Sequence, residues 1–166
     1  SKVLDKYGVD GDYILFVGTL QPRKNLTRLI EAFSQIKTKD IQLVIVGKKG
    51  WMYEEILQAP KKYGVENSVR FLDFVPNEDL SSLYQNATCF VLPSLYEGFG
   101  LPVLEAMAHG IPVVVSNSSS LPEIAGDAGI YVDPQDSESI RTGIDTALSE
   151  QPKTRAARIA SGKKRV

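Results

Sequence analysis

Short apolar runs alternate with segments of helical period along most of the chain. Six runs rich in β-branched and aromatic residues predict strands at Tyr13–Val17, Ile41–Val46, Val69–Leu72, Thr88–Leu92, Pro112–Ser116 and Ile130–Val132. Most of these runs are apolar at every position, which is typical of strands that helices cover on both faces. The pattern therefore predicts an α/β fold in one domain, with a parallel sheet of about six strands and helices on both faces.

Helices are predicted between the strands from apolar stripes at helical spacing and from residues that favour helix ends. They run from a cap at Asn25 to Ile36, from Trp51 to about Tyr63, from a cap at Asn77 through Tyr84, from Pro102 to His109, and from a cap at Asp136 through Leu148. Pro60 weakens the second of them, and Gly110 is the expected stop of the fourth.

The segments that follow the predicted strands hold most of the glycines, prolines and unpaired polar residues. They are residues 18–24, 47–50, 73–77, 93–100 and 116–120. Ligands of open α/β sheets bind outside the carboxyl ends of the strands. We therefore expect any site of this protein at that edge of the sheet.

The first of these turns carries two adjacent cations. Gly18 ends the first strand, and Arg23 and Lys24 lie just before the next helix. The later glycines of a dinucleotide fingerprint are missing, and the turn is not a P-loop. Two cations beside a helix start would suit a diphosphate. Taken alone, however, the turn is better explained by solvated surface charges.

The turn after the fourth strand carries a stronger pattern. Pro102 favours the first position of a helix, and the preceding Leu101 has no side-chain acceptor to cap it. The first amides of that helix are therefore free for an external anion. Gly98 and Gly100 allow a tight turn and let a phosphate approach the backbone.

Two carboxylates flank this helix start. Glu97 lies on the loop and Glu105 about one turn into the helix. An ionised carboxylate only accepts hydrogen bonds, so it suits the vicinal hydroxyls of a ribose or a hexose. A ligand with phosphate in the middle and hydroxyls at both ends fits the arrangement. Surface glutamates that make capping or salt-bridge contacts are the alternative.

Composition and charge limit the classes of function that the chain can have. Hydrophobic residues make up 43% and charged residues 23%, and the formal net charge of −1 gives no reason to expect a nucleic-acid partner. The segment from Gln151 to Val166 has six basic and no acidic residues, which leaves the rest of the chain at −7. We interpret this tail as the solvated start of a helix, with contact to an anionic membrane face as the alternative. With no signal peptide and no membrane-spanning run, we expect a cytoplasmic chain, with the inner face of the membrane as a second location.

The remaining chemistry-bearing residues favour structural roles. Cys89 lies in an apolar run and is expected to be buried, and His109 is expected to contact the last carbonyls of its helix. Asp10 and Asp12 match an Asp-x-Asp metal pattern, but they precede the first strand on the wrong side of the sheet. Because no Cys/His cluster of zinc spacing is present, we expect no metal and no cofactor.

At these motifs the chain resembles the retaining glycosyltransferases of family 4, which have two Rossmann-like lobes in the GT-B architecture. The strongest match is the run Glu97–Glu105, which reproduces the family's E-x7-E signature with its glycines. The segment 18–25 resembles the cation motif of the family's first turn, and residues 75–80 and 110–114 are further typical blocks. The likeness extends from about Tyr13 to Leu148 and corresponds to the C-terminal lobe.

The resemblance implies a Rossmann-like domain that binds a nucleotide-sugar donor. Arg23 and Lys24 would hold the diphosphate beside Gly18, with the amides of Phe99, Gly100 and Leu101 facing it. Glu97 would bind the transferred sugar and act with the two cations in catalysis, and Glu105 would bind the ribose. The base would lie at Asp73, Phe74 and Val75. Where many members have an arginine directly after the first-turn glycine, this chain has Thr19, and Arg23 is the candidate to replace it.

The resemblance also implies retaining hexosyl transfer, with a weak lean toward mannosyl, to a glycan or lipid-linked acceptor in polysaccharide biosynthesis. Residues 1–166 would form the donor-binding lobe, and an N-terminal acceptor lobe is absent from the chain, so we expect little transfer by this lobe alone. The alternatives are a nucleotide-sugar epimerase or phosphorylase-like enzyme, and a non-catalytic sugar-nucleotide-binding module. The missing fingerprint disfavours a dinucleotide oxidoreductase.

Overall fold

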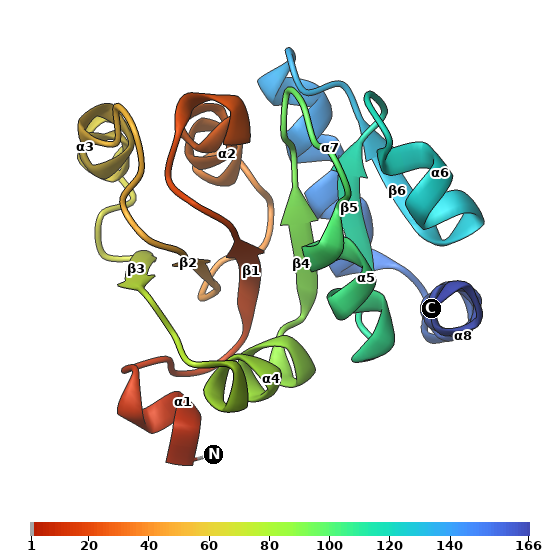
Figure 1. The fold of residues 1–166 in the computed structure, drawn as a ribbon. Coiled ribbons are helices and arrows are strands. Elements are labelled where there is room, and N and C mark those ends of the chain that lie inside the picture. Colours follow the sequence, from red (N-terminus) through yellow and green to blue (C-terminus); the bar gives the residue numbers. More distant parts are fainter. Residues whose placement is uncertain (1) are drawn as a thin grey trace.

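The computed structural model describes residues 2–166 and contains one parallel sheet (Figure 1). Six strands form it in the order β3-β2-β1-β4-β5-β6, and every neighbouring pair is parallel. The strands are β1 (Tyr13–Val17), β2 (Gln42–Val46), β3 (Val69–Asp73), β4 (Cys89–Leu92), β5 (Val113–Ser116) and β6 (Gly129–Val132). The predicted α/β fold and its six strands are confirmed, with boundaries shifted by about one residue.

Helices cover both faces of the sheet (Figure 1). One face carries α2 (Leu26–Phe33), α3 (Glu54–Lys62) and α7 (Ser137–Ser149), and the other carries α1 (Lys2–Lys6), α4 (Asn77–Asn86) and α5 (Leu101–Ala108). The helices α6 (Leu121–Ala125) and α8 (Pro152–Arg165) pack together near β6, and two short 3-10 helices span Pro22–Lys24 and Gly126–Ala128.

The core lies on both faces of the central strands, as the apolar runs predict. Every residue of β4 is buried, and so are all of β1 except Val17. The edge strand β3 is different, because Arg70 and Asp73 on it are exposed and its apolar residues are only half-buried. A strand at the edge of a sheet has a neighbour on one side only, which explains the thinner cover.

One predicted side-chain cap and two predicted helix starts differ from the structure. Asn25 adopts a left-handed conformation with φ 66°, and its side chain caps nothing. It instead donates to the carbonyls of Pro93 and Pro134 at 2.8 and 2.6 Å, so it ties three loops together. Asn77 lies inside α4, after Pro76 at the cap position. The helix expected from Trp51 begins at Glu54, because Met52 has φ 56° and cannot continue a right-handed helix.

The remaining boundaries follow the sequence more closely. Asp136 caps α7 by accepting from the amide of Glu138 at 3.0 Å. Gly110 follows α5 with φ 76°, the left-handed conformation of a helix stop. Pro60 lies within α3 without ending it.

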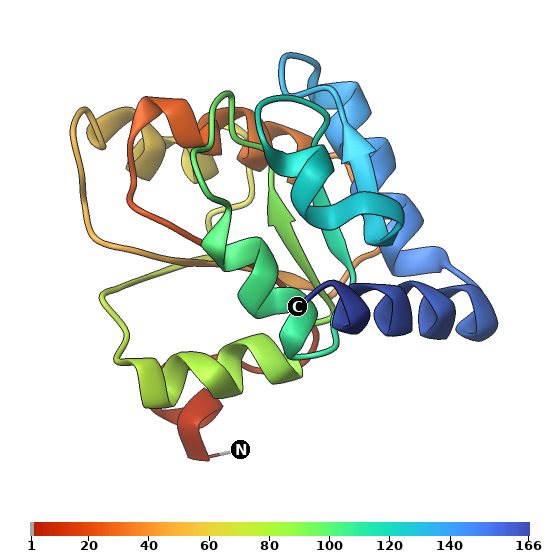
Figure 2. The same ribbon diagram turned by 45° about the vertical axis from the view of Figure 1, so that its right-hand side comes forward.

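The basic C-terminal segment forms α8, which runs beside α5 (Figure 2). Two of its three arginines, Arg155 and Arg158, are half-buried against the rest of the domain, whereas Arg165 is exposed. Arg155 donates to the carbonyl of Thr88 at 2.7 Å, and Arg158 contacts Glu150 at 2.6 Å and the carbonyls of Ala128 and Gly129. The interpretation as a purely solvated helix start is therefore wrong for these arginines, whereas Lys153 and Lys164 are exposed.

Candidate functional site

The sheet reverses its strand order between β1 and β4, and two glycine-bearing loops flank that point. The loop after β1 holds Gly18 to Lys24, and the loop after β4 holds Pro93 to Gly100. Such a switch point leaves a crevice at the carboxyl ends of the strands, which is where open α/β sheets bind ligands. The two strongest sequence motifs therefore meet at one place.

A buried ion pair joins the two loops. Lys24 Nζ lies 3.0 and 2.9 Å from the two carboxylate oxygens of Glu97, and only 6% of Lys24 and 7% of Glu97 are exposed. Arg23 lies at the rim, where its Nη1 is 3.8 Å from Glu97 Oε2 and donates to the carbonyl of Tyr96 at 3.1 Å. The structure thus brings together the three residues predicted to be catalytic.

Gly18 lies between the ring of Phe16 and the Lys24 side chain. A Cβ atom on Gly18 would lie 3.4 Å from Lys24 Cε and 3.1 Å from the ring of Phe16. The neighbouring Gly47 is more tightly constrained, because a Cβ there would lie 1.8 Å from the Gly18 carbonyl oxygen. The loops after β1 and β2 are therefore packed backbone to backbone, which positions the cation-bearing turn.

The backbone of Glu97 is held by serines from the loop between β5 and α6. Ser119 Oγ accepts from the Glu97 amide at 3.1 Å and donates to its carbonyl at 2.7 Å. Ser120 Oγ lies 3.0 Å from the same carbonyl and 2.9 Å from that of Gly98. Ser119 adopts φ 59°, a conformation that is uncommon for serine. These contacts fix the loop that carries the carboxylate.

The start of α5 presents free backbone amides beside this ion pair. Gly100 stands at the cap position with φ 64°, and α5 has no side-chain cap. No acceptor within residues 2–166 takes the amides of Phe99, Gly100 or Leu101. A Cβ on Gly98 would meet nothing within 4 Å, so the space above this turn is open. An uncapped helix start with open space is suited to an anion.

Glu105 lies one turn into α5 and is exposed. It lines a cavity of about 240 Å³ between α4 and α5 together with Asn77, Leu80, Ser81, Tyr84 and His109. His109 Nδ1 is 2.7 Å from the carbonyl of Glu105, which confirms its expected contact at the helix end. Cys89 is buried and free, as predicted.

The three residues expected at a base lie at the end of β3 and directly after it, two strands away from β1. Asp73 has φ 57° and accepts from the amide of Phe74 at 2.8 Å. Phe74 is exposed with Lys48 Nζ 5.2 Å from its ring centre, whereas Val75 is buried. Within residues 2–166, no hydrogen bond or ion pair joins these three residues to the pair of Lys24 and Glu97.

Large exposed apolar side chains gather at the same edge of the sheet. Trp51 and Met52 follow β2, Phe74 follows β3, and Leu95, Tyr96, Phe99 and Leu101 follow β4 or start α5. Phe99 is the most exposed at 82%. Contiguous apolar surface on a folded chain marks an interaction surface more often than scattered exposed residues do.

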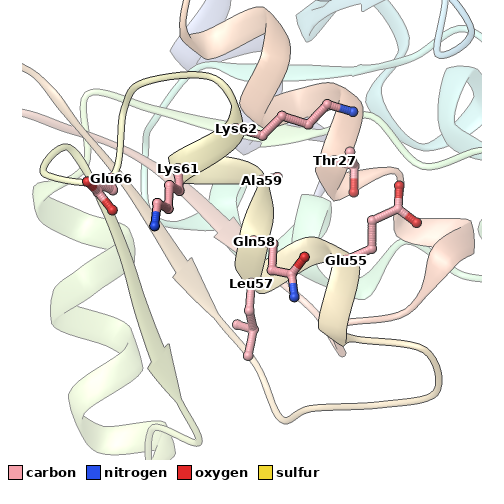
Figure 3. Close-up of a pocket in the computed structure, with 8 residues that line it drawn as sticks. All are labelled: Thr27, Glu55, Leu57, Gln58, Ala59, Lys61, Lys62 and Glu66. Carbon is pink, nitrogen blue, oxygen red and sulfur yellow. The ribbon is translucent and has the colours of Figure 1, made fainter.

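A hollow of about 730 Å³ lies between α2 and α3 (Figure 3). None of the predicted site residues lines it. Its charged side chains, Glu55, Lys61, Lys62 and Glu66, point in different directions and do not converge on one point (Figure 3). Over residues 2–166, no group of three or more His, Cys, Asp or Glu side chains is arranged to hold a metal ion.

Sequence reasoning missed the serines that hold Glu97. The run Ser118-Ser119-Ser120 directly after a predicted strand was the available signal, because hydroxyls at that edge can reach a neighbouring loop. No helix in the described part of the chain is long and apolar enough to cross a membrane.

A parallel sheet of this order, with an uncapped helix start at its switch point, defines a Rossmann-like α/β domain. The sequence matches the family described as "Glycosyl transferases group 1" over residues 6–165. The chain belongs to this family, as the resemblance predicts.

Similar proteins agree with that assignment. The chain is 43% identical over 152 residues to the O-antigen chain mannosyltransferase B of Escherichia coli, covering 89% of this chain and 40% of that protein. It is 38% identical to the serotype-specific mannosyltransferase WbdA of Escherichia coli, covering 89% of this chain and 19% of that one. The structure of sucrose-phosphate synthase from Thermosynechococcus elongatus superposes with a TM-score of 0.84 at 28% identity, over 99% of this chain and 43% of that chain. The chain thus spans less than half the length of these relatives.

Proposed function

We propose that this chain is the donor-binding lobe of a glycosyltransferase and binds a nucleotide-diphosphate sugar at the switch point between β1 and β4. The observation that carries the proposal is the convergence of Arg23, Lys24 and Glu97 with the free amides at the start of α5. Two cations and a helix start suit a diphosphate, and a carboxylate beside them suits sugar hydroxyls.

The same arrangement suits the chemistry of glycosyl transfer. Departure of the nucleoside diphosphate places negative charge on the phosphate next to the broken bond. A cation at about 4 Å stabilises that charge by about 4 kcal/mol at an effective dielectric near 20. Loss of one such preorganised contact lowers a rate by about 10²- to 10³-fold. Arg23 would supply this contact, and the 45% exposure of its side chain supports that role.

We further propose that the transferred sugar is mannose, since the two Escherichia coli relatives described above, 43% and 38% identical to this chain, are named mannosyltransferases. The acceptor would lie on a second lobe, and the exposed aromatic and aliphatic side chains at the carboxyl edge would face it. The chain covers only 40% of the O-antigen chain mannosyltransferase B of Escherichia coli. The rest of that relative has room for such a second lobe. No resident cofactor or metal has a part in the proposal.

Calorimetric titration of the chain with GDP, UDP, ADP and NADH tests the proposal. We expect one nucleoside diphosphate to bind, and Arg23→Ala and Glu105→Ala each to weaken it. Lys61→Ala is the matched control, because Lys61 is an exposed cation on α3 outside the site. Binding of NADH alone would favour a dinucleotide oxidoreductase, and binding of none of the four would refute the donor site.

A further inference from the structure

The hydroxyl of Tyr84 is buried and has no hydrogen-bond partner among residues 2–166. The residue is 1% exposed. A buried hydroxyl without an acceptor is unfavourable, so such a group in a folded protein calls for a partner. Tyr84 lines the cavity of about 240 Å³ between α4 and α5 that Glu105 also lines.

Contacts on both sides fix the Tyr84 ring. It stacks on the His109 ring with a centroid distance of 5.2 Å and an interplanar angle of 14°, and it packs against Phe90 at 5.9 Å. His109 Nδ1 contacts the Glu105 carbonyl at 2.7 Å, and its Nε2 lies 2.9 Å from Ser81 Oγ. His109 therefore connects the ring of Tyr84 on α4 to the backbone of Glu105 on α5.

Glu105 is the carboxylate that lines the same cavity as that hydroxyl. Its carboxylate is exposed and has no salt-bridge partner in the described chain. Burial raises the pKa of Tyr84, and the neighbouring Glu105 charge adds to the shift. A carboxylate offers about four lone-pair sites, so it can accept from a tyrosine and from ribose hydroxyls together.

We propose that Tyr84 is a positioning residue whose hydroxyl donates to the Glu105 carboxylate and holds it toward the ribose hydroxyls of a bound nucleoside diphosphate. The inference rests on the proposed donor site. The tyrosine does not touch the ligand. It determines how strongly the site distinguishes a ribose from a sugar without the 2′-hydroxyl.

The test compares ribonucleotides with their 2′-deoxy forms. The chain is titrated with GDP, UDP and ADP and with dGDP, dUDP and dADP, and the ratio of the two Kd values is measured for the base that binds. We expect Tyr84→Phe to reduce the preference for the ribonucleotide by about three- to tenfold, the loss typical of one intramolecular hydrogen bond. Binding of the 2′-deoxy form, which keeps only the 3′-hydroxyl, should weaken less. In a Glu105→Ala background, Tyr84→Phe should have no further effect.

Tyr13→Phe is the matched control. The Tyr13 hydroxyl is also buried, but it donates to the carbonyl of Leu83 at 2.7 Å and so only supports α4. This variant should lower the melting temperature and leave the ribose preference unchanged, whereas Tyr84→Phe keeps both ring contacts and should fold.

The possible failures can be told apart. An unchanged ribose preference in Tyr84→Phe would overturn the role of Tyr84 and leave the donor site standing. Equal weakening of ribo- and 2′-deoxynucleotides would mark a purely structural residue and overturn it as well. If the unsubstituted chain bound no nucleoside diphosphate, the proposed function would fall, and this inference with it.

Discussion

Replacement of Lys24 by methionine removes the buried cation that holds Glu97 and keeps most of the apolar stem. The two groups are 2.9 Å apart at their closest, and less than a tenth of each side chain is exposed. At an effective dielectric near 20, two unit charges at that distance attract by about 6 kcal/mol. Desolvation of both groups offsets much of this attraction, so the net value of the pair is small.

Removal of one partner is different, because it leaves the other charge buried and unpaired. Such changes cost about 3–5 kcal/mol, a large share of the 5–15 kcal/mol that stabilises a typical domain. Arg23 lies 3.8 Å from the same carboxylate and can turn toward it. We therefore expect Lys24→Met to cost about 3 kcal/mol, and Glu97→Gln to cost at least as much, because Arg23 and Lys24 then both lose their counter-charge.

Urea unfolding of Lys24→Met, Glu97→Gln and the double variant measures these values as a double-mutant cycle. The double variant should be more stable than the sum of the single losses predicts, by about 2 kcal/mol or more. Lys6→Met is the matched control, because Lys6 forms an exposed ion pair with Asp79 at 2.8 Å. Additive single losses, or a Lys24→Met variant as stable as the Lys6→Met one, would refute the argument that this pair ties the two loops together.

Three further results follow from the packing and the charges. Gly47→Ala should destabilise the fold by several kcal/mol in urea unfolding, because its Cβ would lie 1.8 Å from the Gly18 carbonyl oxygen. Gly11→Ala is the control: Gly11 has φ 72° and open space around it, so this change should cost only about 1 kcal/mol. Hydrogen bonds from Lys6 and Tyr7 lower the pKa of Asp79 below its ordinary value of 3.8. The stability that ionised Asp79 gives the fold is therefore complete above that pH and is lost as the pH falls through the lower native pKa. Asp79→Asn should make the melting temperature fall less steeply at acid pH, and an unchanged dependence on pH would contradict this. Burial raises the pKa of the Cys89 thiol to about 12, so a thiol reagent at about pH 8 should label the chain only as it unfolds, and rapid labelling of the folded chain would count against the buried placement.

The fold was predictable because most of its information is local. Strands buried on both faces need apolar residues at every position, and the runs around Leu15 and Phe90 have them. The cap at Asp136 and the stop at Gly110 also depend only on neighbouring residues. The cap expected at Asn25 failed because distant carbonyls, at Pro93 and Pro134, compete for its side chain.

The candidate site was predictable in its parts but not in its connections. The pattern of glycines and charges indicates the two loops, and the resemblance to the family names their residues. The pairing of Lys24 with Glu97 joins positions 73 residues apart. The contact of Ser119 with Glu97 likewise depends on the adjacency of β4 and β5 in the sheet. Contacts of this kind follow from strand order, which residue patterns do not determine.

These connections change how the two cations would act in the proposed function. Lys24 is engaged with both oxygens of Glu97 and is buried, so a phosphate could recruit it only by sharing or opening that pair. Arg23 is 45% exposed and can turn to a ligand without loss of a buried contact. We therefore expect the phosphate to contact Arg23 and the amides at the start of α5 first. Lys24 would then act mainly through Glu97, by holding its carboxylate oriented toward the transferred sugar.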